Sequence, residues 1–247
     1  MNVFVSGGSR GIGRAIALRL ARDGTGLGTP VRVGIGYFRS DAAAEVTAEE
    51  LRALGAEPVL VRGNITSERV LEEVAALGPL DVLVHNAASG VSVPALEATE
   101  KHWDWTMNTN TRALLQLAQV VAPSMPDGSS IVAISSLGAQ RVLTNYTLVG
   151  TSKAALEALV RYLAVELAPR IRVNAVSGGV VETDALDAFP NRDEMLAAGR
   201  ANPVGRMVGS NDIAGAVAFL CSKDADMIRG QTIVVDGGFS LLAGERG

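Results

Sequence analysis

The chain opens with Val3-Phe4-Val5-Ser6-Gly7-Gly8-Ser9-Arg10-Gly11-Ile12-Gly13, a short apolar strand that leads through a glycine-rich turn into a helical pattern. Glycines allow a tight turn, and the N-terminus of a helix presents free N–H groups and a positive dipole end to a pyrophosphate. A glycine-rich loop alone is only a turn. Between a strand and a helix it predicts a nucleotide-binding site.

The rest of the chain repeats this alternation of strand and helix. Short runs rich in Val and Ile predict strands at Val3–Ser6, Val31–Tyr37, Pro58–Arg62, Val82–His85, Ser130–Ser135, Ile171–Val176 and Thr232–Val235. Helical spacing of apolar residues predicts helices at Gly11–Asp23, Ala42–Leu54, Ser67–Leu77, His102–Val121, Thr151–Ala168 and Asn211–Leu220, with Ser210 as the N-cap of the last. We therefore expect one α/β domain over residues 1–247, a Rossmann-type, doubly wound, seven-stranded parallel sheet with helices on both faces.

The composition excludes several classes of protein. The 22 basic and 26 acidic residues give a net charge of −4, so the basic excess needed for binding nucleic acid is missing. No apolar run is long enough to span a membrane, and no leader-like segment precedes the first strand. The single cysteine, Cys221, is expected to be a small buried hydrophobe, and no Cys/His cluster suggests a metal site. A reducing cytoplasm is the expected location.

The end of the second predicted strand indicates which dinucleotide binds. An acidic residue there would bind the ribose hydroxyls of NAD, but the chain has Tyr37-Phe38-Arg39-Ser40. Arg39 can pair with a 2′-phosphate, helped by Arg10 in the glycine turn. We therefore predict NADPH as the cofactor.

The spacing Gly7-x-x-x-Gly11-x-Gly13 resembles the fingerprint of the short-chain dehydrogenase/reductase family. That resemblance extends to Gly63-Asn64-Ile65, to His85-Asn86-Ala87-Ala88 and to Gly179-Val180-Val181 with Thr183. It implies cofactor contacts from Gly7, Ser9, Arg10, Gly11, Ile12, Gly13, Arg39, Asn64, Ile65, Asn86, Ala87, Ala88, Lys153, Gly179, Val181 and Thr183. His85 replaces the first Asn of the family pattern, and we expect it to be a packed or hydrogen-bonded residue, not a catalytic one.

The family's Ser, Tyr and Lys segment is matched by Ser136, Tyr146 and Lys153, with one departure. Carbonyl-reducing members separate Tyr and Lys by three residues, but here that position is Val149, which cannot ionise. On a helix, positions i and i+7 share a face but lie one turn farther apart than i and i+4. Ketone reduction places negative charge beside the carbon that accepts hydride, whereas reduction of an enoyl thioester places it on an oxygen two carbons away. The longer spacing therefore favours enoyl reduction.

Long further matches resemble the type III branch of the bacterial enoyl-acyl-carrier-protein reductases. They are His102-Trp103-Asp104-Trp105-Thr106-Met107-Asn108, Ser135-Ser136-Leu137-Gly138, Val173-Asn174-Ala175-Val176-Ser177-Gly178-Gly179 and Ile228-Arg229-Gly230-Gln231-Thr232. The resemblance implies NADPH, a thioester of acyl carrier protein or CoA as substrate, and a homotetramer. It assigns Tyr146 to the thioester carbonyl, Lys153 to the nicotinamide ribose, and supporting places to Ser136 and Asn110.

Residues from about 184 to 207 interrupt the alternation and are expected to form a lid over the acyl chain, with Leu186, Phe189 and Met195 facing the substrate. Trp103 and Trp105 are expected in the core or in an oligomer interface. Two alternatives to enoyl reduction stay open. One is a 3-oxoacyl-thioester ketoreductase, and the other is a catalytically silent NADPH-binding regulator on the same fold. The sequence does not separate fatty-acid from polyketide synthesis.

Overall fold

Seven parallel strands form one sheet in the computed structural model, which describes residues 1–182 and 192–242. The order across the sheet is β3-β2-β1-β4-β5-β6-β7. The strands are β1 (Asn2–Ser6), β2 (Arg32–Tyr37), β3 (Glu57–Arg62), β4 (Val82–His85), β5 (Ser129–Ser136), β6 (Ile171–Gly178) and β7 (Thr232–Val235). The predicted doubly wound, seven-stranded parallel sheet is confirmed.

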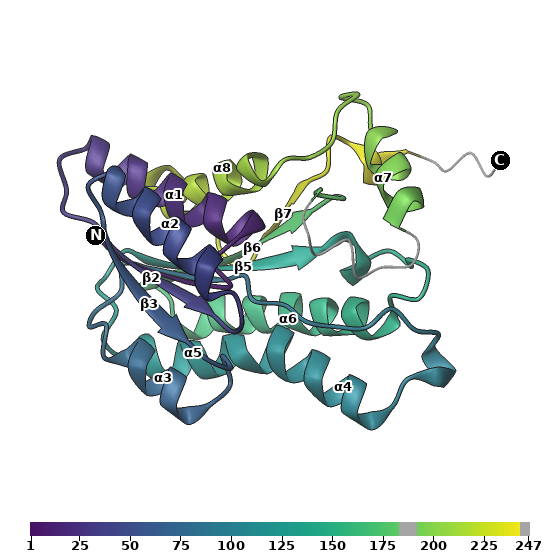
Figure 1. Ribbon diagram of the computed structural model, residues 1–247, viewed down its shortest axis with the longest axis horizontal. Coiled ribbons are helices and arrows are strands. Elements are labelled where there is room, and N and C mark those ends of the chain that lie inside the picture. The colour runs from purple at the N-terminus through teal and green to yellow at the C-terminus, as the bar shows by residue number, and fades with distance from the viewer. Residues whose placement is uncertain (183–191, 243–247) are drawn as a thin grey trace.

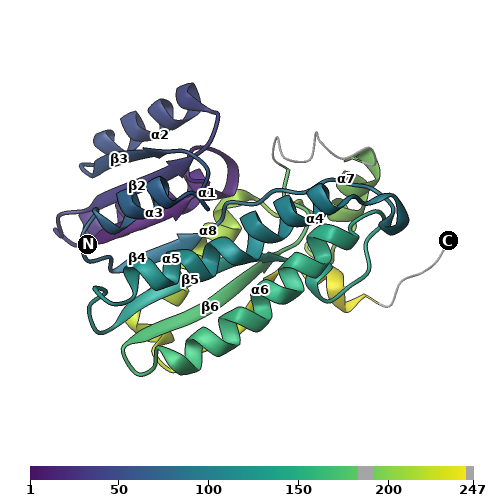
Figure 2. The ribbon, with the colours of Figure 1, turned by 90° about the horizontal axis from the view of Figure 1, so that it is seen from below.

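Helices cover both faces of this sheet (Figures 1 and 2). One face carries α1 (Gly11–Gly26), α2 (Asp41–Ala53) and α8 (Ser210–Cys221). The other carries α3 (Glu68–Ala75), α4 (Glu100–Met107), α5 (Ala113–Val121) and α6 (Thr147–Glu166). Helix α7 (Arg192–Arg200) lies beyond the carboxyl ends of β5 and β6, near the start of α6.

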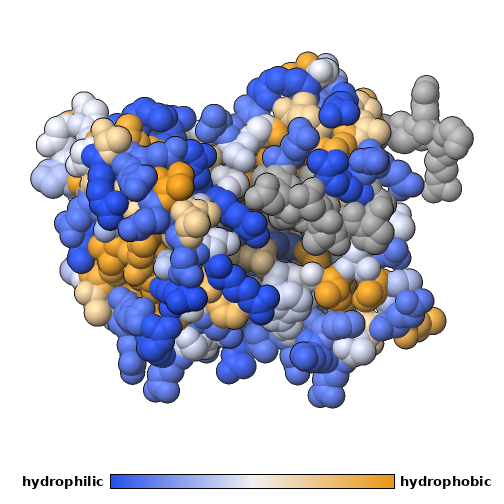
Figure 3. Space-filling model, viewed as in Figure 1, coloured by the Kyte–Doolittle hydropathy of each residue, from blue (hydrophilic) through white to orange (hydrophobic). Residues whose placement is uncertain are grey.

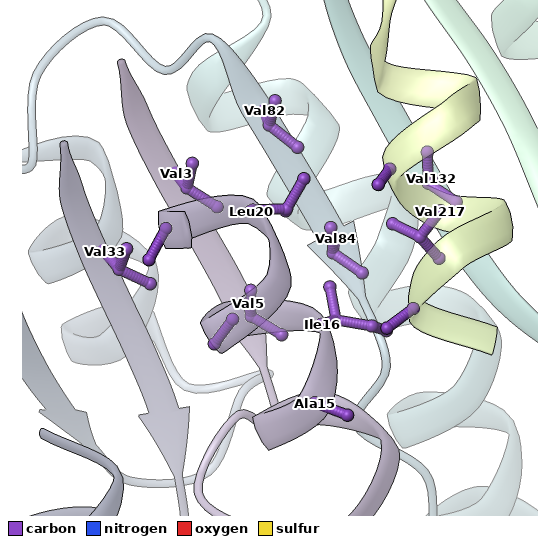
Figure 4. Close-up of a cluster of buried hydrophobic side chains, with 14 of the residues drawn as sticks. Val3, Val5, Ala15, Ile16, Leu20, Val33, Val82, Val84, Val132 and Val217 are labelled. Atoms are coloured by element: carbon purple, nitrogen blue, oxygen red, sulfur yellow. The ribbon is translucent and has the colours of Figure 1, made fainter. Parts of the chain in front are cut away.

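Two hydrophobic layers hold the helices to the sheet. Because successive side chains of a strand point to opposite faces, Val3 and Val5 of β1 pack with one layer and Phe4 with the other. Figure 4 shows the first layer, where Ile16 and Leu20 of α1 lie against the strands. These apolar runs are buried on both faces, as a parallel sheet requires.

Several helix boundaries differ from those predicted by one to four residues, and the differences at α6, α8 and α4 bear on the site. Helix α6 begins at Thr147 instead of Thr151, directly after Asn145, which has the left-handed φ of +55° that asparagine tolerates. Ser210 is the first helical residue of α8 and not its N-cap; that position belongs to Gly209, whose N–H donates to the Asp212 carboxylate at 2.8 Å.

The helix predicted over His102–Val121 begins two residues earlier, at Glu100, and contains a π-helical turn at Asn108–Arg112 between α4 and α5. Asn, Thr and Arg give no periodic signal for such a turn. Single π turns inside helices are frequent at functional sites.

Hydrophilic residues cover most of the surface drawn in Figure 3, and hydrophobic residues gather in several separate groups. Within residues 1–182 and 192–242, no helix is both long enough and apolar enough to cross a bilayer.

Candidate active site

The sheet order reverses between β1 and β4, and their carboxyl ends define the candidate site. In doubly wound sheets, ligands bind in the crevice at this reversal. Ser6 ends β1, His85 ends β4, and the two residues are partners in the parallel ladder. The glycine turn follows the first of these strands, and Asn86 follows the second.

Glycines let the turn pack tightly against α1, whose first N–H groups are not capped by the Arg10 side chain. Gly7 has φ +66°, and a Cβ built on Gly13 would lie only 2.1 Å from the Gly7 carbonyl oxygen. Side chains at these positions would strain or separate the turn and α1, which begins at Gly11. The N–H groups at the start of α1 therefore stay open to an anion.

The residues predicted to contact the cofactor lie around this turn. Asn86 donates from Nδ2 to the carbonyls of Ser6 at 3.2 Å and Gly7 at 2.9 Å, which ties the loop after β4 to the turn. Arg39 is exposed at the end of β2, and its guanidinium lies 4.9 Å from the centre of the Phe38 ring. This stacking presents the cation at the rim where a 2′-phosphate is expected.

The other residues predicted to contact the cofactor differ in how far their side chains are exposed. Ile12, Ala87 and Gly179 are partly buried, and Arg10 and Ala88 are exposed. The side chains of Ser9, Ile65 and Val181 are buried, so they can offer a cofactor mainly backbone groups. The Asn64 side chain accepts from the N–H and hydroxyl of Thr66 and thereby shapes its own loop.

Ser136 and Tyr146 form the first part of the candidate catalytic group. Their hydroxyl oxygens lie 3.3 Å apart, and Ser136 Oγ also accepts from the Gly138 N–H at 3.3 Å. Burial raises the pKa of the Tyr146 phenol above its ordinary value, and the hydrogen bond with Ser136 opposes that rise. The phenol is therefore protonated and able to donate at neutral pH.

Lys153 forms the second part. Its side chain is buried, and Nζ donates to the Ile134 carbonyl at 2.7 Å. Burial lowers the pKa of Lys153 from 10.5 to about 8. Tyr146 and Lys153 therefore contact two residues of β5 that lie two positions apart, roughly 6.6 Å at the rise of a strand.

Asn110 lies in the π turn and is fully buried. Its side-chain amide accepts from the Ser89 N–H at 2.8 Å and donates to the Ser89 carbonyl and to Ser152 Oγ, both at 2.9 Å. Ser152 directly precedes Lys153 on α6. Asn110 is thus linked to the helix that carries the lysine.

Several residues of the site were missed from the sequence. A Cβ on Gly138 would lie 2.5 Å from Cδ1 and Cε1 of the Tyr146 ring, so the ring packs flat on that glycine. The buried Glu157 carboxylate accepts from Ser135 Oγ at 2.6 Å and Gln140 Nε2 at 2.9 Å, which fixes the segment after β5 to α6. The only available signal was a glutamate one helical turn after Lys153, on an otherwise apolar face.

The predicted lid is described only in part. Thr183, Leu186 and Phe189 lie outside the described residues. Met195 on α7 is half-buried, Leu196 is buried, and Val181 pairs with Val208 in an isolated parallel bridge. The function of the segment as a lid stays a prediction.

The structure also tests the predictions for the two tryptophans and for the single cysteine. Trp103 and Trp105 are 42% and 52% exposed, so a place in the core is wrong. Cys221, expected to be a buried hydrophobe, is only partly buried and packs against the first hydrophobic layer, where burial raises the pKa of its thiol to about 12. Among the described residues no group of three His, Cys, Asp or Glu side chains is placed to hold a metal ion.

Comparison with known proteins identifies the family of this chain. The family model described as "Enoyl-(Acyl carrier protein) reductase" matches residues 7–240. A 1-cyclohexenylcarbonyl-CoA reductase of Streptomyces collinus is 38% identical over 97% of this chain and 87% of its own length. The 3-oxoacyl-[acyl-carrier-protein] reductase FabG of Staphylococcus epidermidis is 36% identical over 97% of this chain and 99% of its own length.

A solved structure of a related protein has the same fold. A short-chain dehydrogenase from Burkholderia cenocepacia, crystallised in complex with NADP, superposes with a TM-score of 0.86 and is 31% identical. The match covers 96% of this chain and 97% of that one. Fold and site define an oxidoreductase of the doubly wound type. The chain belongs to the short-chain dehydrogenase/reductase superfamily, within the family of that enoyl-reductase model.

Proposed function

We propose that this chain uses NADPH to reduce the carbon–carbon double bond of trans-2-enoyl thioesters. The position of the phenol carries the proposal. Tyr146 stands just before α6 and contacts Ser136, while Val149, at the place of the tyrosine in carbonyl reducers, is 6% exposed and apolar. Val149 can neither donate a proton nor stabilise an oxyanion.

The residues around the glycine turn fit NADPH. The N–H groups at the start of α1, which the Arg10 side chain does not cap, can bind a pyrophosphate, and the exposed Arg39 can pair with a 2′-phosphate. The Burkholderia structure that superposes on this chain was solved with NADP. When bound, NADPH supplies the hydride that adds to the substrate carbon β to the thioester carbonyl.

The side chains of this chain then have separate tasks. Tyr146 hydrogen bonds through its hydroxyl to the thioester oxygen, where the enolate charge develops, and Ser136 orients that hydroxyl. A proton from solvent then adds to the α carbon of the enolate and completes the saturated thioester. Lys153, protonated at neutral pH because its pKa is about 8, binds the nicotinamide ribose and adds positive charge.

One relative supports the choice of substrate by its name. In a 1-cyclohexenylcarbonyl thioester the double bond is conjugated with the carbonyl, so the Streptomyces collinus enzyme is named for an α,β-unsaturated acyl-CoA. The matching family model has an enoyl reductase description. A thioester of CoA or of acyl carrier protein is therefore the proposed substrate, in fatty-acid or polyketide synthesis.

A 3-oxoacyl-thioester ketoreductase is the second candidate. The observation that favours it is the 36% identity to a FabG of that activity over nearly the whole of both chains. Tyr146 would then have to protonate the oxygen on the carbon that accepts hydride, despite its longer spacing from Lys153.

The test compares NADPH oxidation on crotonyl and acetoacetyl thioesters, with Tyr146→Phe beside the wild type. Turnover of the crotonyl thioester that collapses in the variant supports enoyl reduction. Preferential turnover of the acetoacetyl thioester contradicts it and supports the ketoreductase. Binding of NADPH without turnover of either compound also contradicts it and supports a silent regulator.

We also propose that copies of this chain associate as a homotetramer. Apolar residues are exposed along the outer helices, among them Trp105 of α4 at 52%, and Tyr162 and Val165 of α6 at 70% and 78%. A contiguous apolar patch on a protein surface marks an interaction site, and we place the interface on these outer helices. Light scattering during gel filtration checks this, and a monomer at micromolar concentration would contradict it.

A further inference from the structure

His85 is the titratable group at the centre of the site to which the proposed mechanism gives no task. It ends β4 beside Ser6 of β1, at the point where the sheet order reverses, and it is fully buried. Its Nδ1 lies 3.0 Å from Ser6 Oγ and its Nε2 lies 3.1 Å from the carbonyl oxygen of Asn110. Both ring nitrogens therefore have partners.

These contacts determine where the imidazole proton is. A carbonyl can only accept, so Nε2 must carry the hydrogen and donate it to Asn110. In a neutral ring Nδ1 is then an acceptor, and the Ser6 hydroxyl donates to it. The Ser6 oxygen can still accept, and the N–H groups of Asn86 and Ala87 both donate to it at 3.0 Å.

The imidazole stays neutral in this position. Burial, followed by the nearby charge of Lys153, lowers the pKa of His85 from 6.5 to about 3, while hydrogen bonds to the backbone at Asn110 and Thr109 oppose the shift. At neutral pH the His85 ring therefore has one hydrogen-bond donor, Nε2, and one acceptor, Nδ1. It is not a proton donor to substrate.

The hydrogen bonds continue from His85 in both directions. Toward the cofactor, Ser6 holds Asn86, whose side chain holds the Gly7 carbonyl of the glycine turn. Toward the catalytic group, Asn110 donates to Ser152 Oγ, and Thr111 Oγ1 donates to the Ser152 carbonyl at 2.7 Å. His85 is one of two links between these halves: it bonds the backbone carbonyl of Asn110, and Ser89, in the loop after β4, bonds the Asn110 side chain.

We propose that His85 is a positioning residue, which holds the π turn at Asn110 against the end of β4 and so fixes Lys153 relative to the glycine turn. The proposal rests on the proposed reductase function. An asparagine, the residue of the resembling family pattern, places its amide near the Nδ1 position and keeps the contact with Ser6. It is too short to reach the Asn110 carbonyl, whereas a glutamine reaches the Nε2 position.

The two substitutions therefore separate the two contacts. His85→Asn should lower kcat about tenfold, the effect of one lost hydrogen bond on the transition state, and leave KM for NADPH within about twofold. His85→Gln should restore most of kcat. His102→Gln is the matched control, because a glutamine at that position of α4 keeps the capping box with Thr99.

The rates are measured on whichever thioester the wild type reduces, so failure of enoyl reduction and failure of this proposal are distinguishable. If His85→Asn keeps the wild-type kcat, or if both variants lose kcat equally, the positioning role is overturned. The tautomer of His85 is tested with the site itself unchanged. The chain has two histidines, and ¹H–¹⁵N NMR of His102→Gln shows His85 alone. A neutral ring protonated at Nε2 at pH 7 supports the proposal, and an Nδ1-protonated or charged ring contradicts it.

Discussion

The cofactor end of the site, at Gly7–Gly13 and Arg39, consists of backbone groups and an exposed cation, whereas Tyr146 and Lys153 at the catalytic end are partly or wholly buried side chains. The first end excludes side chains so that a ligand can approach the chain itself. The second uses burial to set the protonation of its groups. Substitutions at the two ends should therefore change different kinetic constants.

The largest effect is expected from removing the phenol. Tyr146→Phe should lower kcat by at least about 10²-fold, because a donor to a developing oxyanion is lost, while NADPH binding is unchanged. Steady-state kinetics and fluorescence titration with NADPH check the two parts. Tyr162→Phe on α6 is the control, because it also removes a phenol hydroxyl but keeps the apolar ring of the proposed interface, and it should keep wild-type activity.

The next effect is expected from displacing the phenol without changing it. Gly138→Ala would bring a methyl group within 2.5 Å of the Tyr146 ring, so the ring must move and kcat should fall about tenfold or more. Gly26→Ala is the control, since a Cβ on Gly26 meets nothing within 4 Å. A Gly138→Ala enzyme with unchanged kcat would show that the position of the ring is not critical.

At the other end, Arg39→Ala should raise KM for NADPH about tenfold and leave kcat nearly unchanged, because a charge-assisted pair with the 2′-phosphate is lost. The KM for NADH should not rise. Arg22→Ala on α1 is the control for the loss of one exposed positive charge. A fall in kcat instead of a rise in KM would break the division between the two ends.

The pH profile tests the burial of Lys153. With a pKa of about 8, the ammonium form is lost as the pH rises through 8, so kcat/KM should fall on the alkaline side of that value. A profile that stays flat to pH 10 would mean that Lys153 keeps an ordinary pKa or that its charge is not needed.

The last prediction concerns stability and not a kinetic constant. His85 has a folded pKa of about 3 and an unfolded pKa near 6.5, so only the unfolded chain takes up this proton as the pH falls below 6.5. Stability is therefore lost with acidification, by about 2 kcal/mol between pH 7 and pH 5 from this group alone. His85→Gln should lose that much less in urea unfolding over the same interval. An equal loss of stability in both proteins would mean that burial does not lower the pKa of His85 in the folded protein.

Much of this molecule could be predicted from the sequence because its signals are local. The glycine turn between a strand and a helix, the Val-rich strands and Arg39 at the end of β2 depend on neighbouring residues only. The π turn could not be predicted, because the sequence of Asn108–Arg112 has no periodic signal. The early start of α6 could not be predicted either, because the left-handed conformation of Asn145 depends on its surroundings in the fold. The hydrogen bond from His85 to Asn110 joins residues 25 positions apart, which no spacing rule relates.

Competition between the two candidate substrates tests the central claim most directly. Equal amounts of crotonyl and acetoacetyl thioester are mixed with the enzyme and a limiting amount of NADPH, and the products are measured by mass spectrometry. Because Tyr146 lies seven residues before Lys153 in the sequence and Val149 occupies the position of a ketoreductase tyrosine, the product should be the butyryl thioester. A mixture dominated by the 3-hydroxybutyryl thioester would contradict enoyl reduction and assign this site to carbonyl chemistry.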